Sequence, residues 1–489
     1  MVIDFTKKVR KIVSLLLVFT LLIGGGIYFK NKSIGVTALK VNDEKSINRY
    51  TMDAIFNDET KRIMCNQNVE YINNTKSDLD KVYFHIYPNA FSKKEFAPFE
   101  QDEMEQAYPN GFNEGYIDIK NILNNGKKLE YEIKGDKNDI LEVKLDRSIK
   151  PNEKVSIDMK YNVKLPNSEG RFGYGENTIN VTNWFPIACV NDDRGWNLKG
   201  YEAVGDPFYS ETSDFYVKLL LPKKYKVGTT GSIVNQKVGN EKTLYEIQAK
   251  KVRDFAFVLS DKFDVYKDTY KNININTYNL NKDLSKESTQ IAKDSIKIFS
   301  ELFGEYPYDT YSVIASDFYI GGMEYPMMVM IDQSLYNDKN KFLMEYVIAH
   351  ETAHQWWYSV IGNDEISEPW LDEALTEYST VLYFEKKYGK EVGEKLIKTM
   401  EIQAKNKSSE NIFKPSNQYK NSLEYSLNVY TKGALVFNEI RNKVGDKVFF
   451  DTLKEYFNKY KFENVNGVKF VDIWNSNGVD IDKIIKEYK

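Results

Sequence analysis

Hydrophobic and polar residues alternate along much of the first half of the chain. Three neighbouring runs show the pattern: Leu129, Tyr131 and Ile133; Leu141, Val143 and Leu145; and Val155, Ile157, Met159, Tyr161 and Val163. Because successive side chains of a strand point to opposite faces, each run predicts a half-buried antiparallel strand. The same character continues to DFAFVLS, which ends at Ser260. We therefore predict one large antiparallel β domain over residues 46–265.

The periodicity then changes to that of helices. In LSKESTQIAKDSIKIFSELFG, the residues Ile291, Ile298, Phe299 and Leu302 share one helical stripe, with Ser285 placed to cap the start and Gly304 to end it. Short strand patterns, YSVIASDF and MMVMI, follow, and the chain is mostly helical from residue 341 onward. Residues 266–489 are therefore predicted to form an α+β domain whose helices lie toward the C-terminus.

Two of the later helices follow each other closely. The first is predicted from Phe342 to Ile361, with Asp338 or Asn340 as its start signal and Gly362 as its stop. The second is predicted over EPWLDEALTEYSTVLYFEKKYG, which opens with proline in a first-turn position and closes on glycine at 389.

An apolar segment lies close to the N-terminus. Residues 12–29, IVSLLLVFTLLIGGGIYF, carry no charge and would span about 27 Å as a helix. Four cations precede the segment, which favours a cytoplasmic N-terminus over residues 1–11, a single-pass membrane anchor over 12–29 and a linker over 30–45. The rest of the chain would then lie outside the cell membrane. The alternative is a signal peptide cleaved after Ala38 and a secreted protein.

Composition narrows the classes of partner. A length of 489 residues predicts two or three domains, and a net charge of -4 argues against nucleic acid. The two cysteines, Cys65 and Cys189, form no zinc or redox motif, and their pairing stays open. Nothing in the sequence sets the oligomeric state.

Two of the three histidines occur in one short motif, HETAHQWW. His350 and His354 lie four residues apart, so a helix would present both imidazoles on one face with Glu351 beside them. This is the HExxH pattern of two zinc ligands and a general base. A catalytic zinc needs a third protein ligand, and Glu373, 19 residues past His354, lies near the start of the next helix. We predict one Zn2+ per chain, with Glu377 either supporting a ligand histidine or lying on a solvated face.

These segments resemble a known family. His350, Glu351, His354 and Glu373 resemble the zinc site of the gluzincin aminopeptidases of the aminopeptidase N and leukotriene-hydrolase type. The family's second segment usually reads W-L-N-E-G, where this chain reads WLDEA. FHIYPNAF and NWFPIACV resemble sequence segments of the family's saddle-shaped β domain, in which His85 would be structural. The resemblance implies a saddle-like domain followed by a thermolysin-like zinc peptidase domain.

A third segment, GGMEY, resembles the family's G-x-M-E-N signature. The resemblance implies that Glu324 binds the free α-amino group of the substrate and that Gly321, Gly322 and Met323 lie beside the substrate. A carboxylate that pairs with an ammonium group would discriminate against capped peptides. Tyr325 stands where the family has Asn.

A fourth segment, VYTKGALVF, resembles the family's Y-x-K-G helix. The resemblance implies that Tyr430 donates a hydrogen bond to the oxyanion formed during hydrolysis. Gly433 adds a physical argument, because a glycine inside a helix is about 1 kcal/mol less favourable than alanine and suggests a close approach.

The predicted function is that of a zinc metalloaminopeptidase, a hydrolase that releases N-terminal residues from peptides with a free N-terminus. Glu351 and Tyr430 would be its catalytic residues. Two alternatives stay open: an endopeptidase or other small-molecule hydrolase that uses the same centre, and a membrane-tethered binding module with an inactive centre.

Overall fold

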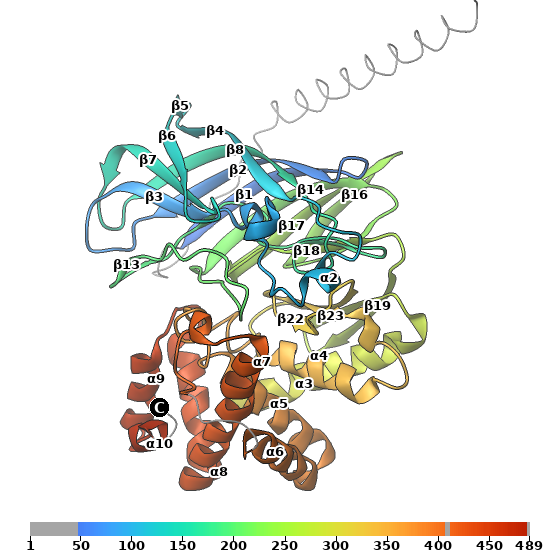
Figure 1. The fold of residues 1–489 in the computed structure, drawn as a ribbon, viewed down its shortest axis with the longest axis vertical. Coiled ribbons are helices and arrows are strands. Elements are labelled where there is room, and N and C mark those ends of the chain that lie inside the picture. Colours follow the sequence, from blue (N-terminus) through green and yellow to red (C-terminus); the bar gives the residue numbers. More distant parts are fainter. Residues whose placement is uncertain (1–46, 406–410, 487–489) are drawn as a thin grey trace, which may run out of the picture. The chain divides into compact units, whose positions relative to one another are not determined.

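The computed structural model describes residues 47–405 and 411–486 of the chain (Figure 1). The predicted cytoplasmic segment, anchor and linker lie outside these residues, so they stay predictions. Among the helices that are described, none combines the length and apolar character needed to cross a bilayer.

The N-terminal part is built from β-strands around a large sheet. Its eight strands lie in the order β16-β17-β14-β1-β2-β8-β4-β5. They are β1 (Asn48–Asn57), β2 (Arg62–Ile72), β4 (Tyr116–Asn124), β5 (Lys127–Lys128), β8 (Lys154–Lys164), β14 (Ser213–Pro222), β16 (Ser232–Val238) and β17 (Lys242–Val252). Neighbouring strands are antiparallel except β1 and β14, which run parallel, so the sheet is mixed and not purely antiparallel as predicted.

Three smaller sheets complete this part. Their orders are β11-β3-β7-β6, β15-β18-β10-β9 and β12-β13. The strands are β3 (Leu79–His85), β6 (Glu130–Lys134), β7 (Ile140–Ile149), β9 (Gly173–Tyr174), β10 (Ile179–Val181), β11 (Ile187–Ala188), β12 (Asn191–Asp192), β13 (Gly195–Trp196), β15 (Lys226–Thr229) and β18 (Phe257–Ser260). A short helix, α2 (Met104–Ala107), lies between strands β3 and β4 in the sequence.

The alternation predicted from the sequence is confirmed in β7 and β8, whose apolar residues are buried. It is only partly confirmed in β6. Leu129 is buried, but Tyr131 and Ile133 are 36% and 39% exposed. β6 is an edge strand that pairs only with β7, so its apolar side chains are less completely covered.

The second part begins with a five-stranded sheet in the order β19-β20-β21-β23-β22. Its strands are β19 (Asp264–Tyr270), β20 (Ile273–Asn279), β21 (Thr310–Ser316), β22 (Gly322–Met323) and β23 (Met328–Asp332). Helix α3 (Ser285–Phe303) connects β20 to β21, which run parallel. The predicted stripe of α3 is buried and Gly304 ends the helix, but Ser285 is its first residue and donates to Asp264 instead of capping.

The helices of the second part lie at the end of the molecule opposite the large β-sheet (Figure 1). They are α4 (Lys341–Ala353), α5 (Glu373–Tyr388), α6 (Lys390–Lys405), α7 (Ser422–Tyr425), a π-helix (Ser426–Lys432), α8 (Gly433–Tyr460), α9 (Gly467–Ser476) and α10 (Asp482–Lys486). The predicted fold class is confirmed: a β-rich domain precedes an α+β domain that is mostly helical toward the C-terminus. One continuous cluster of buried apolar side chains extends through both parts, so the boundary near residue 265 stays a prediction.

Helix α4 ends earlier than its sequence predicts. It stops at Ala353, and the chain then turns, with the Ser359 amide donating to the His354 carbonyl at 2.9 Å. The cause lies far away in the sequence. The buried guanidinium of Arg253 donates to the Tyr358 carbonyl at 2.8 Å, and a side chain at Gly362 would overlap it. A helix continued to Ile361 would lose these contacts.

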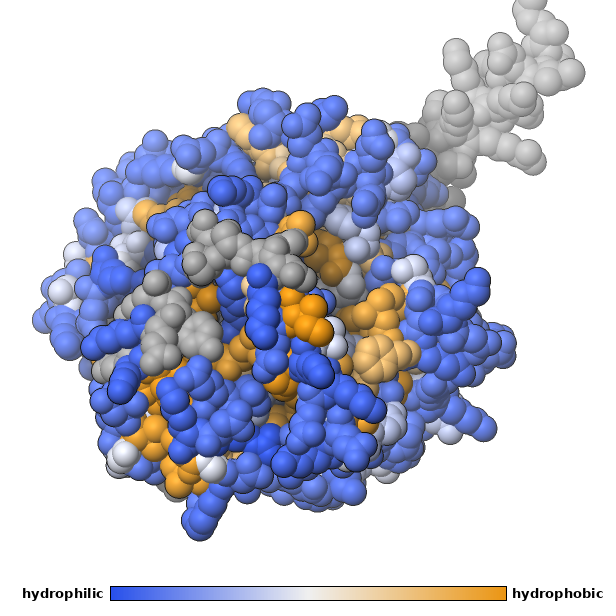
Figure 2. Space-filling view, turned by 60° about the horizontal axis from the view of Figure 1, so that its bottom comes forward, coloured by the Kyte–Doolittle hydropathy of each residue, from blue (hydrophilic) through white to orange (hydrophobic). Residues whose placement is uncertain are grey.

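Hydrophilic residues dominate the surface shown in Figure 2, where hydrophobic residues form separate groups. Cys65 and Cys189 are both buried and form no disulfide. His85 is 1% exposed and stacks on the Tyr87 ring with 4.8 Å between centroids. Neither ring nitrogen of His85 has a hydrogen-bond partner among the described residues.

Candidate metal centre

Helices α4 and α5 bring three predicted ligands together. His350 lies in the last turn of α4, His354 follows with helical backbone angles, and Glu373 is the first residue of α5. Glu373 Oε2 lies 3.4 Å from His350 Nε2 and 3.2 Å from His354 Nε2. All three side chains are buried. The early end of α4 therefore does not disturb the convergence.

The other ring nitrogen of each histidine is held by a neighbour. His350 Nδ1 lies 3.0 Å from Glu377 Oε2, and His354 Nδ1 lies 3.0 Å from the Trp357 carbonyl oxygen. Tyr346 in turn donates to the second oxygen of Glu377. Both Nε2 atoms are consequently directed at Glu373. Of the two alternatives for Glu377, the structure places it beside His350, in the interior and not on a solvated face.

The three donor atoms fit a zinc ion. Zinc bonds of about 2.0–2.2 Å at tetrahedral angles separate neighbouring ligand atoms by roughly 3.3–3.5 Å. The observed distances from Glu373 Oε2 are 3.4 and 3.2 Å. Glu373 Oε2 is shielded from water and accepts no conventional hydrogen bond from the described residues. Two imidazoles and a carboxylate are also the donor types that catalytic zinc uses.

The electrostatics of this trio follow from burial and close pairing. Burial opposes protonation of His350, but its close approach to Glu373 and its contact with Glu377 raise its pKa to about 10. Burial alone would raise the pKa of Glu373, whereas the charge of His354 and the close approach of both imidazoles lower it. A positive charge at this point is therefore strongly favoured, and a metal ion can supply it in place of protons.

Glu351 lies beside the ligands, as the motif predicts. Burial raises its pKa to about 7, with His350 and His354 acting in the opposite direction. Gly322 makes room for this carboxylate, because a Cβ at residue 322 would lie 2.2 Å from Glu351 Oε1. The GGMEY segment thus contacts the HExxH helix directly, and its second glycine is required by that contact.

Glu324 is also brought into the centre. It is 3% exposed, and a carboxylate oxygen of Glu324 lies within 4.8 Å of ligand atoms on both Glu351 and His354. Gln355 holds the segment in place by donating to the carbonyls of Glu324 and Tyr325 at 3.3 and 3.2 Å. Burial raises the pKa of Glu324 well above its usual value.

The other residues of GGMEY support this placement. Met323 is buried, and its sulfur accepts a hydrogen bond from Arg171 Nε at 3.1 Å. Tyr325 donates to Asn183 Oδ1 at 2.9 Å, which anchors the segment to the NWFPIACV motif of the β-rich part. Gly321 has a positive φ of 98°, and a Cβ there would have nothing within 4 Å, so the turn, and not a contact, favours glycine.

Tyr430 reaches the centre from the π-helix Ser426–Lys432. Its hydroxyl donates to Glu373 Oε1, and its ring stacks on His350 with 5.6 Å between centroids. Short π-helical segments are frequent at functional sites. Gly433 explains how the helix comes so near, because a Cβ there would lie 2.3 Å from the Cβ of Ala374. The close approach predicted from this glycine is confirmed.

Three buried carboxylates of the centre were not predicted as site residues. Asp206 from the β-rich part pairs with Arg171, and Glu365 and Asp372 lie on the segment that joins α4 to α5. Asp372 is visible in the sequence as a departure from W-L-N-E-G. Asp206 and Glu365 lie in loops without periodicity, so no sequence signal identifies them.

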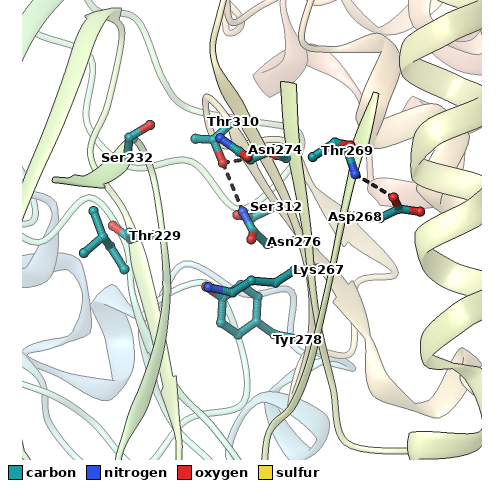
Figure 3. Close-up of a pocket in the computed structure, with 12 residues that line it drawn as sticks. Thr229, Ser232, Lys267, Asp268, Thr269, Asn274, Asn276, Tyr278, Thr310 and Ser312 are labelled. Atoms are coloured by element: carbon teal, nitrogen blue, oxygen red, sulfur yellow. Dashed lines mark hydrogen bonds between the residues drawn. The ribbon is translucent and has the colours of Figure 1, made fainter. Parts of the chain in front are cut away.

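A polar pocket of about 310 Å3 lies elsewhere, between strands β15–β16 and the sheet of β19, β20 and β21 (Figure 3). Ser232, Lys267, Asn276, Tyr278, Thr310 and Ser312 are among its lining residues. None of the predicted site residues lines this pocket. The chemistry indicated by the sequence is therefore located at the buried centre.

Residues 262–488 match the family described as the peptidase family M1 domain. Among characterised relatives, endoplasmic reticulum aminopeptidase 1 of Mus musculus is 26% identical over 238 residues, which cover 45% of this chain and 25% of the relative. Aminopeptidase B of Homo sapiens is 27% identical over 215 residues, covering 39% of this chain and 31% of the relative. The chain thus spans about a quarter to a third of these relatives.

The fold is also similar to that of a solved protein, an M1 zinc metallopeptidase from Deinococcus radiodurans. The TM-score is 0.66, and the match covers 90% of this chain and 93% of the solved chain. At 14% sequence identity this likeness concerns the fold. It includes both the β-rich part and the helical part that contribute side chains to the centre.

Proposed function

We propose that the chain, whose residues 262–488 match the peptidase family M1 domain, is a zinc aminopeptidase acting on peptides with a free N-terminus. One observation carries the proposal. The convergence of His350, His354 and Glu373 has Glu351 and Glu324 beside it, so a metal site, a base and an ammonium-binding carboxylate share one buried centre.

His350, His354 and Glu373 would hold the ion. Zinc at such a site supplies Lewis acidity toward the scissile carbonyl and lowers the pKa of water. Glu351 then accepts a proton from water and returns it to the leaving amine. Its pKa of about 7, raised by burial, suits a group that takes and releases a proton near neutral pH.

Glu324 would select the free N-terminus. Its Oε1 is shielded from solvent and has no hydrogen-bond partner among the described residues. An ammonium group would stabilise a buried carboxylate that has no other partner. An acetylated amine or an internal peptide bond carries no charge and would not stabilise it in this way. This difference favours exopeptidase activity over cleavage within a chain.

Tyr430 would act on the oxygen of the tetrahedral intermediate. Its hydroxyl reaches Glu373, so it lies next to the ligand set and would turn from the carboxylate toward a substrate oxygen. The ring stack on His350 limits where the hydroxyl can move.

Structures of similar proteins support a substrate of this class. A variant of the Deinococcus radiodurans M1 zinc metallopeptidase binds a Tyr-Ser-Ala substrate, and a variant of a two-domain M1 zinc metallopeptidase binds L-arginine and L-tryptophan. By analogy we propose that short peptides occupy the corresponding space of this chain.

The test is chelator-sensitive release of amino acids. Purified protein should cleave an aminoacyl fluorogenic amide but not its N-acetylated form, lose this activity in a chelator and regain it with zinc. Glu324→Gln should reduce cleavage of the free substrate. Equal cleavage of both substrates would instead indicate an endopeptidase, and no cleavage by zinc-loaded protein would indicate a binding module.

We also propose that residues 12–29 anchor the enzyme, with the catalytic part outside the cell membrane. The uncharged run and the four cations that precede it support this orientation. Protease added to intact cells should digest the catalytic part, and the protein should remain with membranes after alkaline extraction. Recovery of a shortened chain in the medium would support secretion.

A further inference from the structure

Three buried carboxylates form a cluster beside the zinc ligands. Glu324, Glu365 and Asp372 each offer an oxygen, and these oxygens lie within 4.8 Å of one another. The residues are 3%, 1% and 1% exposed. Glu324 follows β22, whereas Glu365 and Asp372 come from the connection between α4 and α5, so separate segments position the cluster.

Each carboxylate has one oxygen without a partner. Glu365 Oε2 accepts from the Phe208 amide at 3.2 Å, and Asp372 Oδ1 accepts from Asn363 Nδ2 at 2.9 Å. These bonds fix the orientation of both groups. Glu324 Oε1, Glu365 Oε1 and Asp372 Oδ2 are shielded from solvent and have no hydrogen-bond partner among the described residues. Three unsatisfied oxygens in a buried space, two of them on oriented carboxylates, require a donor or a cation.

The neighbouring cations are already engaged. Arg171 pairs with Asp206, and the two histidines face Glu373. Three ionised carboxylates would leave three uncompensated negative charges in a region of low dielectric constant.

We propose that Glu324, Glu365 and Asp372 form a second cation site, which takes a hard divalent ion such as Ca2+, Mn2+ or Mg2+. The site offers only oxygen ligands, which these ions prefer, and lacks the nitrogen that zinc takes from the histidines. A separation of 4.8 Å or less between the oxygens permits all of them to contact one ion at bonds of about 2.1–2.6 Å.

The charge balance connects this ion to the substrate. A divalent cation neutralises two of the three carboxylates and leaves one negative charge. The ammonium group of a peptide would neutralise that charge. The Glu324 carboxylate would then bridge the ion and the ammonium group, and the ion would hold that carboxylate in one orientation for the amine. This effect on turnover rests on the proposed aminopeptidase function, whereas the binding of the cation does not.

The experiment uses the full chain loaded with one zinc. After removal of unbound metal, calorimetric titration with CaCl2, MgCl2 and MnCl2 should show one further site, and added cation should raise the melting temperature. Electron paramagnetic resonance of Mn2+ should show a bound ion that Ca2+ displaces. The absence of saturable binding of all three ions would overturn the proposal, with protons then neutralising the cluster.

Variants locate the site. Asp372→Asn and Glu365→Gln preserve side-chain volume and should each weaken cation binding about tenfold or more, while the zinc content stays at one per chain. Glu368→Gln is the matched control, since Glu368 lies in the same segment and accepts from the Gly467 amide. Unchanged binding in both cluster variants, or equal loss in the control, would overturn the assignment. Should one variant fail to fold, the other variant and the Mn2+ spectrum of the unmodified chain would still show whether the cation site exists.

Activity separates this inference from the proposed function. The KM for free-amine substrates should fall on addition of the cation, and Asp372→Asn should abolish that fall. Cation binding without peptidase activity would refute the aminopeptidase proposal and leave the site standing. Peptidase activity in a protein that binds no second cation would refute the cation site and leave the aminopeptidase proposal standing.

Discussion

Polar side chains gather both in the metal centre and in the pocket of Figure 3, but their surroundings differ. Several side chains of the pocket are hydrogen-bonded. Asn276 Nδ2 donates to Thr310 Oγ1 at 3.0 Å, and Ser232 donates to Asp309 at 2.7 Å. Lys267 lies exposed at its edge. In the metal centre, by contrast, several carboxylates each keep one buried oxygen that has no hydrogen-bond donor among the described residues: Glu324, Glu365, Asp372 and Glu373.

The contrast shows what makes a polar cluster reactive. Water reaches the pocket and competes for each of its groups, whereas the side chains of the centre are almost fully buried, so that their charges are less well solvated. There burial raises the pKa of Glu351 to about 7, and the partners of His350 raise its pKa to about 10. The comparison predicts large effects of substitution at the centre and small ones at the pocket.

The largest effect is expected for Glu351→Gln. The amide keeps the shape of the side chain but cannot accept the proton, so kcat should fall by about 10²–10⁴. Metal analysis should still find one zinc per chain, because residue 351 is not a ligand. Substantial turnover in the zinc-loaded variant would show that another group is the base.

Tyr430→Phe should have the next largest effect. It removes one hydroxyl while retaining the ring that stacks on His350, and the loss of an oxyanion donor lowers kcat by about 10²-fold. KM and zinc content should change little. A variant that loses zinc instead would show that the hydrogen bond to Glu373 is structural.

Glu377→Gln tests the support of the metal ligand. Glu377 orients His350 through Nδ1, and loss of such a partner typically weakens metal affinity or activity by about 10–100-fold. Competition with a zinc chelator would measure the change. Wild-type affinity in the variant would indicate that Thr380, whose Oγ1 lies 3.4 Å from the same nitrogen, suffices.

Substitution of His85 tests whether a buried side chain without hydrogen-bond partners affects the free energy of unfolding when it lies outside the metal centre. Burial lowers its pKa from 6.5 to about 4, so the unfolded chain binds more protons between these values. Its contribution to stability is complete above pH 6.5 and is lost as the pH falls toward 4, by up to about 3 kcal/mol. His85→Phe should flatten the fall in unfolding free energy, measured by denaturant titration across this range. Parallel curves for both proteins would contradict the prediction.

The smallest effects belong to the pocket. Lys267→Ala and Ser312→Ala should change the free energy of unfolding by no more than about 0.5 kcal/mol and leave kcat/KM within about twofold. Denaturant titration and the fluorogenic assay measure both quantities. A tenfold loss of activity would mean that the pocket communicates with the metal centre and would break the comparison.

The sequence predicts where the motif residues lie relative to one another because their geometry is local. Helical spacing places His350 and His354 on one face, and Gly433 signals the close approach that Ala374 confirms. The spacing also identifies Glu373, since the second helix starts soon after the first.

Other features depend on distant parts of the chain. The early end of α4 follows from Arg253, and the exposure of Tyr131 and Ile133 follows from the edge position of β6. Asp206 and Glu365 enter the centre from loops, where neither period nor spacing indicates a position in space. Such residues become recognisable only when the β-rich and helical parts are seen together.

Arg253 also makes contacts that residues 262–488 would lack as a separate fragment. Its guanidinium binds the carbonyls of Tyr358 and Glu463 at 2.8 and 2.7 Å, yet the residue precedes the region that matches the peptidase family. A fragment of residues 262–488 would leave both carbonyls without their donor and would expose the apolar surface that the β-rich half covers. The region that matches the peptidase family is therefore smaller than the compact unit to which it belongs.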